Sequence, residues 1–226
     1  MSSASATKRT GRAESATGGR PPGRRERKKE DTRRRIIEAA TALFAERGYQ
    51  AVTTSEIAEA ADIGAGTLFR YADSKAELLV MVINERLRLG AARGIELADG
   101  GATPTDAILA LLAPLAQASL GHPENAIVYQ RETLFGTGPH RELAAAYVAD
   151  LEEAILQILT RYAETHPVRP DVDLAEAAHA IYSTMYMDLV RVGLGRATVT
   201  DLPTRLRRSV DFLVHTLLDP PPGNTP

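Results

Sequence analysis

The residues of this chain that could do chemistry are lysines and arginines beside short helical segments. Their positive charge suits them to bind phosphate. Lys75 is expected in the first turn of a helix, where a positive charge opposes the helix dipole at a cost of roughly 0.3–1 kcal/mol. A bound phosphate would be favoured by both the helix N-terminus and the lysine. The alternative is that Lys75 is simply exposed to solvent and that the protein tolerates the unfavourable interaction with the helix dipole.

Positive charge is concentrated at the start of the chain. Residues 1–35 contain 12 lysine and arginine residues against four aspartate and glutamate residues, a net charge of +8, whereas residues 36–226 carry −10. This split predicts a polyanionic partner for one end of the chain only, or else a charged tail that only aids solubility. The basic residues nearest the first expected helix are Arg24, Arg25, Arg27, Lys28, Lys29, Arg33, Arg34 and Arg35.

Other chemistry is poorly represented in the sequence. Glu176 and His179 form one Glu-x-x-His, the ligand pattern of di-iron helical bundles, but a second copy is absent, and such a site needs two. The chain has no cysteine, which excludes disulfides and thiolate metal sites. Because there is also no nucleophile–base arrangement and no phosphate loop, we expect no metal, no cofactor, no catalytic residue and no enzymatic activity.

Three short segments must position the phosphate-binding residues. Helical periodicity predicts a helix over 32–47, a second over 54–61 and a third over 65–71. Thr53 and Glu56 form a capping box at the start of the second helix. The second and third helices are each too short to be stable alone, so they must pack on the first. This is the helix-turn-helix arrangement, whose second member lies in the DNA major groove.

The rest of the chain also has helical periodicity. A fourth helix begins near Ser74, which with Glu77 forms another capping box. The fold class is therefore all-α, with about nine helices and no strands. Residues 1–31 have too few large apolar side chains to order, so they are interpreted as a disordered basic arm. The further helices are expected at 105–120, 124–135, 140–165, 173–194 and 201–218, before a loose tail at 220–226.

The stretch from Ile36 to Leu79 resembles the N-terminal domain of the TetR family of one-component bacterial regulators. The resemblance covers about 50 residues in one continuous register and departs at Asp62, where many relatives have glycine. It is carried by Phe44, Gly48, Tyr49, Thr53, Ile57, Ala58, Gly66, Thr67, Leu68, Phe69, Ser74, Lys75, Leu78 and Leu79.

The resemblance implies a homodimer with a DNA-binding domain over 32–76 and a ligand-binding and dimerisation domain over 77–219. It implies a repressor that binds a near-palindromic operator in double-stranded DNA and is released by an unknown small-molecule effector. An activator, a regulator without ligand control and a helical small-molecule or metal-binding protein are the alternatives. In this context the basic arm is expected to contact the minor groove or the DNA backbone.

The resemblance also implies roles for single residues. Thr53 caps the second helix, the two residues after it can meet phosphate, and Lys75 holds a phosphate. Thr67 and Tyr71 occupy positions that the family uses for backbone or base contact. The expected DNA-binding residues are Thr53, Thr54, Ser55, Gly64, Ala65, Thr67, Phe69, Arg70, Tyr71 and Lys75.

The front of the third helix has little capacity for direct base readout. Ala65 and Gly66 offer no side-chain hydrogen bonds to base edges. Readout must therefore depend on Arg70, on Thr67, or on apolar contact of Ala65 and Phe69 with thymine methyl groups. Alternatively, Arg70 reaches only phosphate, which positions the protein without specifying a sequence.

The last two helices each carry an apolar stripe. The resemblance implies that this pair forms a four-helix interface between two subunits, and packing within one chain is the alternative. The stripe residues expected at the interface are Leu174, Ile181, Leu189, Leu202, Leu206, Val210, Leu213 and Leu217.

Polar, aromatic and flexible side chains on otherwise aliphatic helices are the candidates for a ligand pocket. For each of them a core or surface role is the alternative, and Arg131 would matter if the ligand were anionic. The candidates are Tyr129, Arg131, Phe135, Tyr147, His179, Tyr182, Met185 and Tyr186.

The sequence gives no sign of a membrane partner. No apolar stretch approaches the ~20 residues of a membrane span, and the basic N-terminus lacks the apolar block of a secretory signal. Together with the absence of cysteine, this predicts a cytoplasmic protein.

Overall fold

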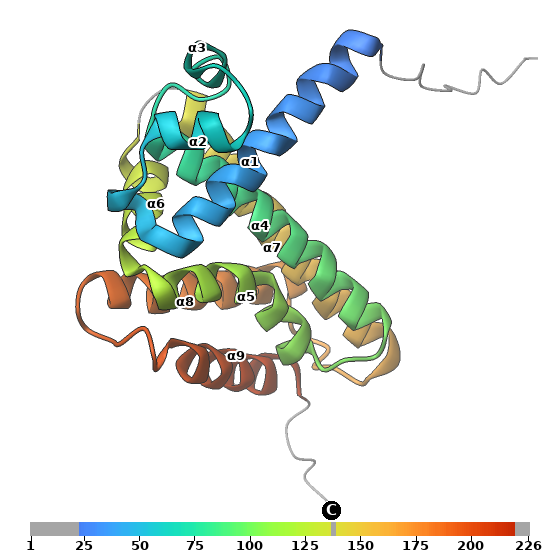
Figure 1. Ribbon diagram of the computed structural model, residues 1–226. Coiled ribbons are helices and arrows are strands. Elements are labelled where there is room, and N and C mark those ends of the chain that lie inside the picture. The colour runs from blue at the N-terminus through green and yellow to red at the C-terminus, as the bar shows by residue number, and fades with distance from the viewer. Residues whose placement is uncertain (1–22, 137–138, 220–226) are drawn as a thin grey trace, which may run out of the picture.

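The computed structural model describes residues 23–136 and 139–219, apart from the side chains of residues 115–120 and 139–145. In these ranges the chain forms nine α-helices and no strand (Figure 1), which confirms the expected fold class. The helices are α1 (Arg24–Ala51), α2 (Thr54–Ala60), α3 (Ala65–Leu68), α4 (Lys75–Asp99), α5 (Pro104–Gly121), α6 (Pro123–Phe135), α7 (Pro139–Thr165), α8 (Leu174–Gly193) and α9 (Leu202–Leu218).

The first helix begins earlier than the sequence predicts. It starts at Arg24, so the expectation of a disordered arm over 1–31 is wrong for its last eight residues. Ion pairs one helical turn apart explain the difference, because Asp31 contacts Arg34 at 2.5 Å and Arg35 at 3.5 Å. Such pairs stabilise the first turns of α1, which have no apolar stripe of their own. Residues 1–22 lie outside the described part of the chain.

Gly48 produces a kink near the end of α1. Its φ of 74° is left-handed, a region that glycine adopts without steric cost. A Cβ atom at this position would also collide with Glu124 and lie 2.6 Å from His122 Nδ1, at the start of α6. The kink therefore lets the end of α1 lie directly against α6.

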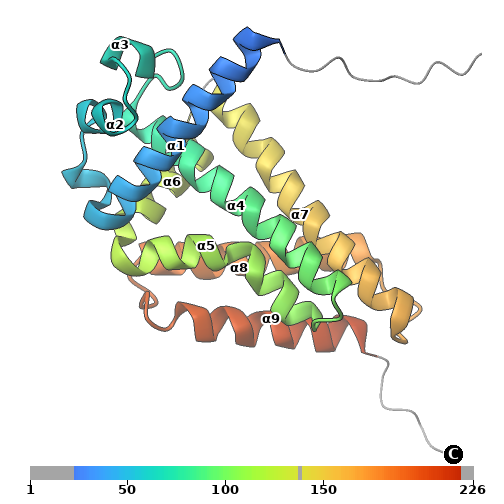
Figure 2. The same cartoon turned by 45° about the vertical axis from the view of Figure 1, so that its right-hand side comes forward.

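The helices form two groups that share one core. The group α1–α3 occupies one end of the molecule, and α4 runs from it into the body, where α5, α8 and α9 lie across α4 and α7 (Figures 1 and 2). Phe44, Ile57 and Leu68 are fully buried between α1, α2 and α3. Buried side chains continue from this group through α4 to the last helix, so α1–α3 are packed on the body.

The third helix is shorter than expected. Only Ala65–Leu68 is α-helical, and the chain then tightens into a turn. In that turn Arg70 N donates to Thr67 O and Tyr71 N donates to Leu68 O, both over three residues. This tighter winding, common at helix ends, replaces the predicted helix over 65–71.

None of the helices in the described ranges is both long enough and apolar enough to cross a membrane.

Candidate nucleic-acid interface

The second helix is fixed by the capping box that the sequence predicts. Thr53 Oγ1 accepts from Glu56 N at 3.3 Å, and Glu56 Oε2 accepts from Thr53 N at 2.8 Å. Hydrogen bonds from Thr53, followed by the ion pair with Arg47, lower the pKa of Glu56 to about 2. This carboxylate therefore favours the folded state at pH values above its ordinary pKa of 4.5, and the contribution is lost as the pH falls toward 2.

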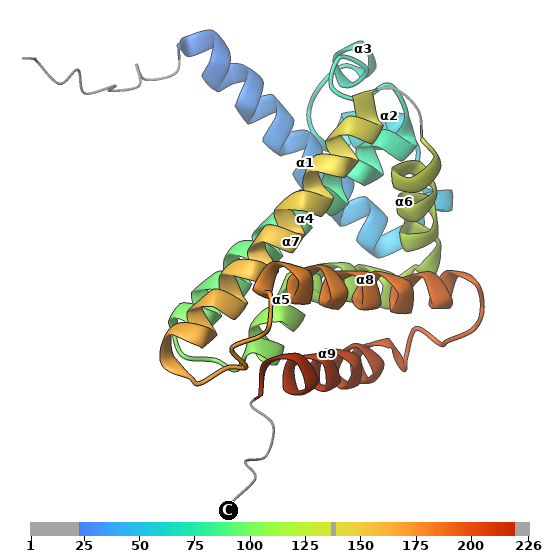
Figure 3. The same cartoon turned by 180° about the vertical axis from the view of Figure 1, so that it is seen from behind.

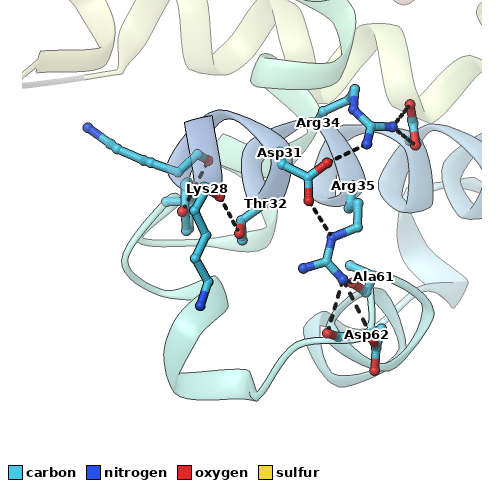
Figure 4. A network of polar contacts seen from close by, with 10 residues as sticks. Lys28, Asp31, Thr32, Arg34, Arg35, Ala61 and Asp62 are labelled. Carbon is cyan, nitrogen blue, oxygen red and sulfur yellow. Dashed lines mark hydrogen bonds and ion pairs between the residues drawn. The ribbon is translucent and has the colours of Figure 1, made fainter. Parts of the chain in front are cut away.

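The turn between α2 and α3 is held by an arginine from α1. Asp62 has a left-handed φ of 51°, which aspartate tolerates better than most side chains. Arg35 Nη1 donates to Ala61 O at 2.9 Å and to Asp62 O at 3.3 Å, and it lies 3.6 Å from Asp62 Oδ2 (Figure 4). Arg35 therefore orients the turn that leads into α3. Its Nη1 is thus engaged within the chain, and phosphate contact by the basic stretch stays a prediction.

The recognition segment, residues 64–71, presents an exposed surface. Gly64, Ala65, Phe69 and Arg70 are exposed, and about half of the Phe69 surface is accessible. Arg70 has neither a hydrogen bond nor an ion pair to any described residue. The segment therefore offers the unpaired guanidinium of Arg70 and the exposed ring of Phe69. Ala65 and Gly66 beside them contribute only a methyl group and a hydrogen.

Tyr71 and the start of α1 lie beside this segment. The Tyr71 hydroxyl donates to Lys29 O at 3.3 Å, so α1 is tied to the end of the recognition segment. The basic residues on the first turns of α1 are all exposed, and this end of the helix projects from the body near α3 (Figure 2). These residues are Arg24, Arg25, Arg27, Lys28 and Lys29.

Lys75 begins α4, as expected, but it is not a free surface cation. Its Nζ donates to Tyr49 O at 2.7 Å and to Val52 O at 2.8 Å, and it lies 4.2 Å from the centre of the Tyr49 ring. An ammonium group has three N–H donors, so two of them are already used. Lys75 therefore acts mainly as an internal tie between α4 and the α1–α2 connection.

Ser74 caps α4, although the second half of the predicted capping box differs. Ser74 Oγ accepts from Glu77 N at 3.1 Å. The Glu77 carboxylate, however, accepts from Asp73 N instead of the main chain of Ser74.

Asn125, which was not among the residues singled out from the sequence, joins α1 to the body. Asn125 is almost fully buried at the start of α6. Its Nδ2 donates to Phe44 O at 3.0 Å, and its Oδ1 accepts from Tyr49 N at 2.8 Å. The available signal was a polar residue sharing one helical face with Val128 and Tyr129. Tyr49 is thus bonded by α6 at its N–H and by Lys75 at its carbonyl.

Half of the predicted ligand residues line a cavity of about 390 Å³ inside the body. Tyr129, Tyr182, Met185 and Tyr186 lie on its wall. The other four candidates do not form part of that lining. Arg131 pairs with Glu132, Phe135 is exposed, Tyr147 is half-buried, and His179 binds Glu152 at 3.0 Å.

The polar groups outside this cavity do not assemble a metal site. His179 turns to Glu152 on α7, so the Glu-x-x-His pattern with Glu176 is not used as a pair. Across the described residues, no cluster of three histidine, aspartate or glutamate side chains could hold a metal ion.

The apolar stripes on α8 and α9 pack mainly inside one chain, so their buried members are not available to a second subunit, and an interface role for the partly buried ones stays a prediction. Five of the eight stripe residues are buried in the core, and the other three are partly buried against it. The buried ones are Ile181, Leu189, Leu202, Leu206 and Val210, and the partly buried ones are Leu174, Leu213 and Leu217.

A buried carboxylate also joins these two helices. Asp188 on α8 is 3% exposed, contacts Arg205 Nε at 2.5 Å and accepts from Ser209 Oγ at 2.8 Å, both on α9. The two helices therefore pack as one unit along the side of the molecule seen in Figure 3.

Comparison with known proteins agrees with this geometry. Residues 36–82 match the family described as "Bacterial regulatory proteins, tetR family". The HTH-type transcriptional repressor KstR of Mycobacterium tuberculosis is 29% identical over 184 residues, which cover 81% of this chain and 81% of the relative. The repressor of the same name from Rhodococcus jostii is 28% identical over 184 residues, covering 81% and 83%.

Solved structures show the same architecture. The transcriptional repressor FadR of Thermus thermophilus, in complex with lauroyl-CoA, superposes with a TM-score of 0.58 at 26% identity and covers 85% of this chain and 100% of its own. FadR of Bacillus subtilis, in complex with stearoyl-CoA, has a TM-score of 0.59 at 22% identity and covers 80% and 97%. Residues 36–82 therefore match the TetR-family model and identify α1–α3 as a helix-turn-helix DNA-binding unit, and the body behind them has the fold of TetR-family regulators.

Proposed function

We propose that this protein is a homodimeric repressor that binds a near-palindromic operator and is released from it by a small molecule. The observation that carries the proposal is the exposed recognition segment with its unpartnered Arg70, mounted on a helical body that contains a cavity. The names of the KstR and FadR relatives support repression, and the acyl-CoA complexes of FadR support control by a ligand.

Arg70 is the residue best suited to read a base. Guanidinium groups bind the O6 and N7 atoms of guanine in the major groove in a bidentate way, and no described residue competes for Arg70. Phe69 and Ala65 supply apolar contact for thymine methyl groups. Ser55, which is exposed, and the half-buried Thr54 and Thr67 are placed to bind phosphate or base edges.

The exposed face of the α8–α9 unit supports dimerisation. Phe212 on α9 is 66% exposed and Met187 on α8 is 54% exposed, although large apolar side chains are usually buried. Leu194, just after α8, is similarly exposed. We propose that this outer face, and not the inner stripes, meets the second subunit.

Helix α6 supplies a route from the cavity to the DNA-binding unit. Ala126, Tyr129 and Gln130 line the cavity, while the adjacent Asn125 bonds the end of α1. A ligand that displaced α6 would therefore change the position of Tyr49, and through Lys75 the start of α4. Two short polar links would carry the signal.

Arg70→Ala should weaken binding to operator DNA by about 5- to 150-fold, because one bidentate base contact contributes roughly 1–3 kcal/mol of discrimination. The measurement is fluorescence anisotropy with a duplex that the wild-type protein has selected from a random library. The matched control is Arg93→Ala, which removes an exposed arginine on α4 that pairs with Glu96. Equal affinities for the wild type and Arg70→Ala would remove Arg70 from the interface.

Replacing Arg24, Arg25 and Arg27 together by glutamine should weaken binding to operator and unrelated DNA to a similar extent. The slope of log affinity against log salt should become shallower by about 0.9 for each phosphate that is no longer neutralised. Arg34→Gln is the control, since Arg34 pairs with Asp31 and Glu38. A slope that does not change in the triple variant would show that the start of α1 does not bind phosphate.

Phe212→Asp should convert the dimer into a monomer, because it places a charge in an apolar interface. Sedimentation equilibrium over a range of protein concentrations measures the change. Phe135→Asp is the control, because Phe135 is 78% exposed on α6, away from the proposed interface. A Phe212→Asp protein that stays as dimeric as the control would contradict the assignment of this face.

A further inference from the structure

The α8–α9 unit carries opposite charges at its two ends. Residues 186–208, around the connection between the helices, contain five arginines against two aspartates, a net charge of +3. The opposite end, residues 169–185 together with 209–219, contains one arginine against five acidic residues, a net charge of −4. Met187 and Phe212 add exposed apolar surface to the outer face of the same unit.

One row of residues on the outer face of α8 repeats this distribution of charge. The outer row consists of Glu176, Ala180, Ser183, Met187 and Arg191. Their spacing of three or four residues places them along one side of the helix, and all are exposed except Ala180, which is half-buried. The side chains of Glu176 and Arg191 form neither a hydrogen bond nor an ion pair with any described residue. The two charges that end the row are therefore available to another molecule.

The middle of the outer row lies level with an exposed ring on α9. The two helices run side by side in opposite directions (Figure 3). Asp188 on α8 bonds Arg205 and Ser209 on α9, which fixes how they align. Following the antiparallel helices from this point places Ser183 opposite Phe212. The outer row and the Phe212 ring therefore share one centre, with the basic end of the unit on one side and the acidic end on the other.

DNA binding determines how two copies of this face can meet. Both recognition segments of a dimer must reach the same duplex, so the two-fold axis runs from the DNA-binding end of the molecule toward the body. Helices α8 and α9 lie across this direction (Figure 3). Rotation about such an axis reverses the helices in the second copy, so the basic end of one unit faces the acidic end of the other. A parallel arrangement would bring like charges together.

We infer that two copies of this chain pair through antiparallel α8 helices that cross at the middle of the outer row, so that Glu176 of each copy pairs with Arg191 of the other. In this register Ala180 lies against Met187 of the second copy, a small side chain against a large one. The two Phe212 rings meet at the axis. The inference rests on the proposed function, in which the outer face is the dimer interface. It adds the register and the charges that select it.

Glu176→Arg and Arg191→Glu should each raise the dissociation constant of the dimer by about 5- to 100-fold at low salt, because each replaces two attractive pairs per dimer by two repulsive ones. An equal mixture of the two variants should associate about as tightly as the wild type, since opposite charges then meet at both ends. Sedimentation equilibrium of the full chain measures these constants. Arg93→Glu makes the same change of charge on α4 and is the matched control; it should keep the wild-type constant.

The mixture separates pairing between copies from an effect on folding, because each variant supplies the charge that the other lacks. A mixture that associates no more tightly than the separate variants would overturn the inference. So would single variants whose dissociation constants equal that of the wild type. If Phe212→Asp still gave a monomer in that case, the proposed dimer would stand and only its register would be wrong. A wild-type protein that is monomeric at every concentration would contradict the proposed dimer itself.

Discussion

The position of the DNA-binding unit depends on hydrogen bonds from the ammonium group of Lys75. This group bonds the carbonyls of Tyr49 and Val52, and so fixes the connection between α1 and α2 to the start of α4. The recognition helix has only four residues and has no stability of its own. Its position therefore comes from ties of this kind, and Arg35 supplies a second one at the turn carbonyls of Ala61 and Asp62. Asn125 extends the same network into the body through Tyr49 N.

The sequence predicts much of this unit because its signals are local. The capping box of Thr53 and Glu56 and the apolar spacing around it identify α2 from adjacent residues alone. The start of α1 was not predicted, because charged pairs replace the apolar stripe over 24–31. The partners of Lys75 were not predictable either, since they are main-chain carbonyls that every residue carries, and only the fold brings them together.

In the body, the periodicity of apolar residues shows that one face of a helix is buried. It does not show whether that face packs within the chain or against a second subunit. The stripe containing Leu206 and Val210 packs within its own chain, while Phe212, which lies off that stripe, remains exposed. Residue type likewise suggests which side chains could line a ligand pocket, but it does not show which of them point into it. Tyr186 faces the cavity and Arg131 faces solvent. These outcomes depend on the angles at which helices cross, which a single sequence does not specify.

The salt dependence of DNA binding by Lys75→Met tests most directly whether Lys75 acts as an internal tie. Methionine keeps the length of the side chain but cannot donate hydrogen bonds, and circular dichroism would establish that the helices persist. If the lysine orients the DNA-binding unit, affinity should fall while the slope of log affinity against log salt keeps its wild-type value. An unchanged affinity would contradict the account, and so would a slope shallower by about 0.9, which would show that Lys75 itself neutralises a phosphate.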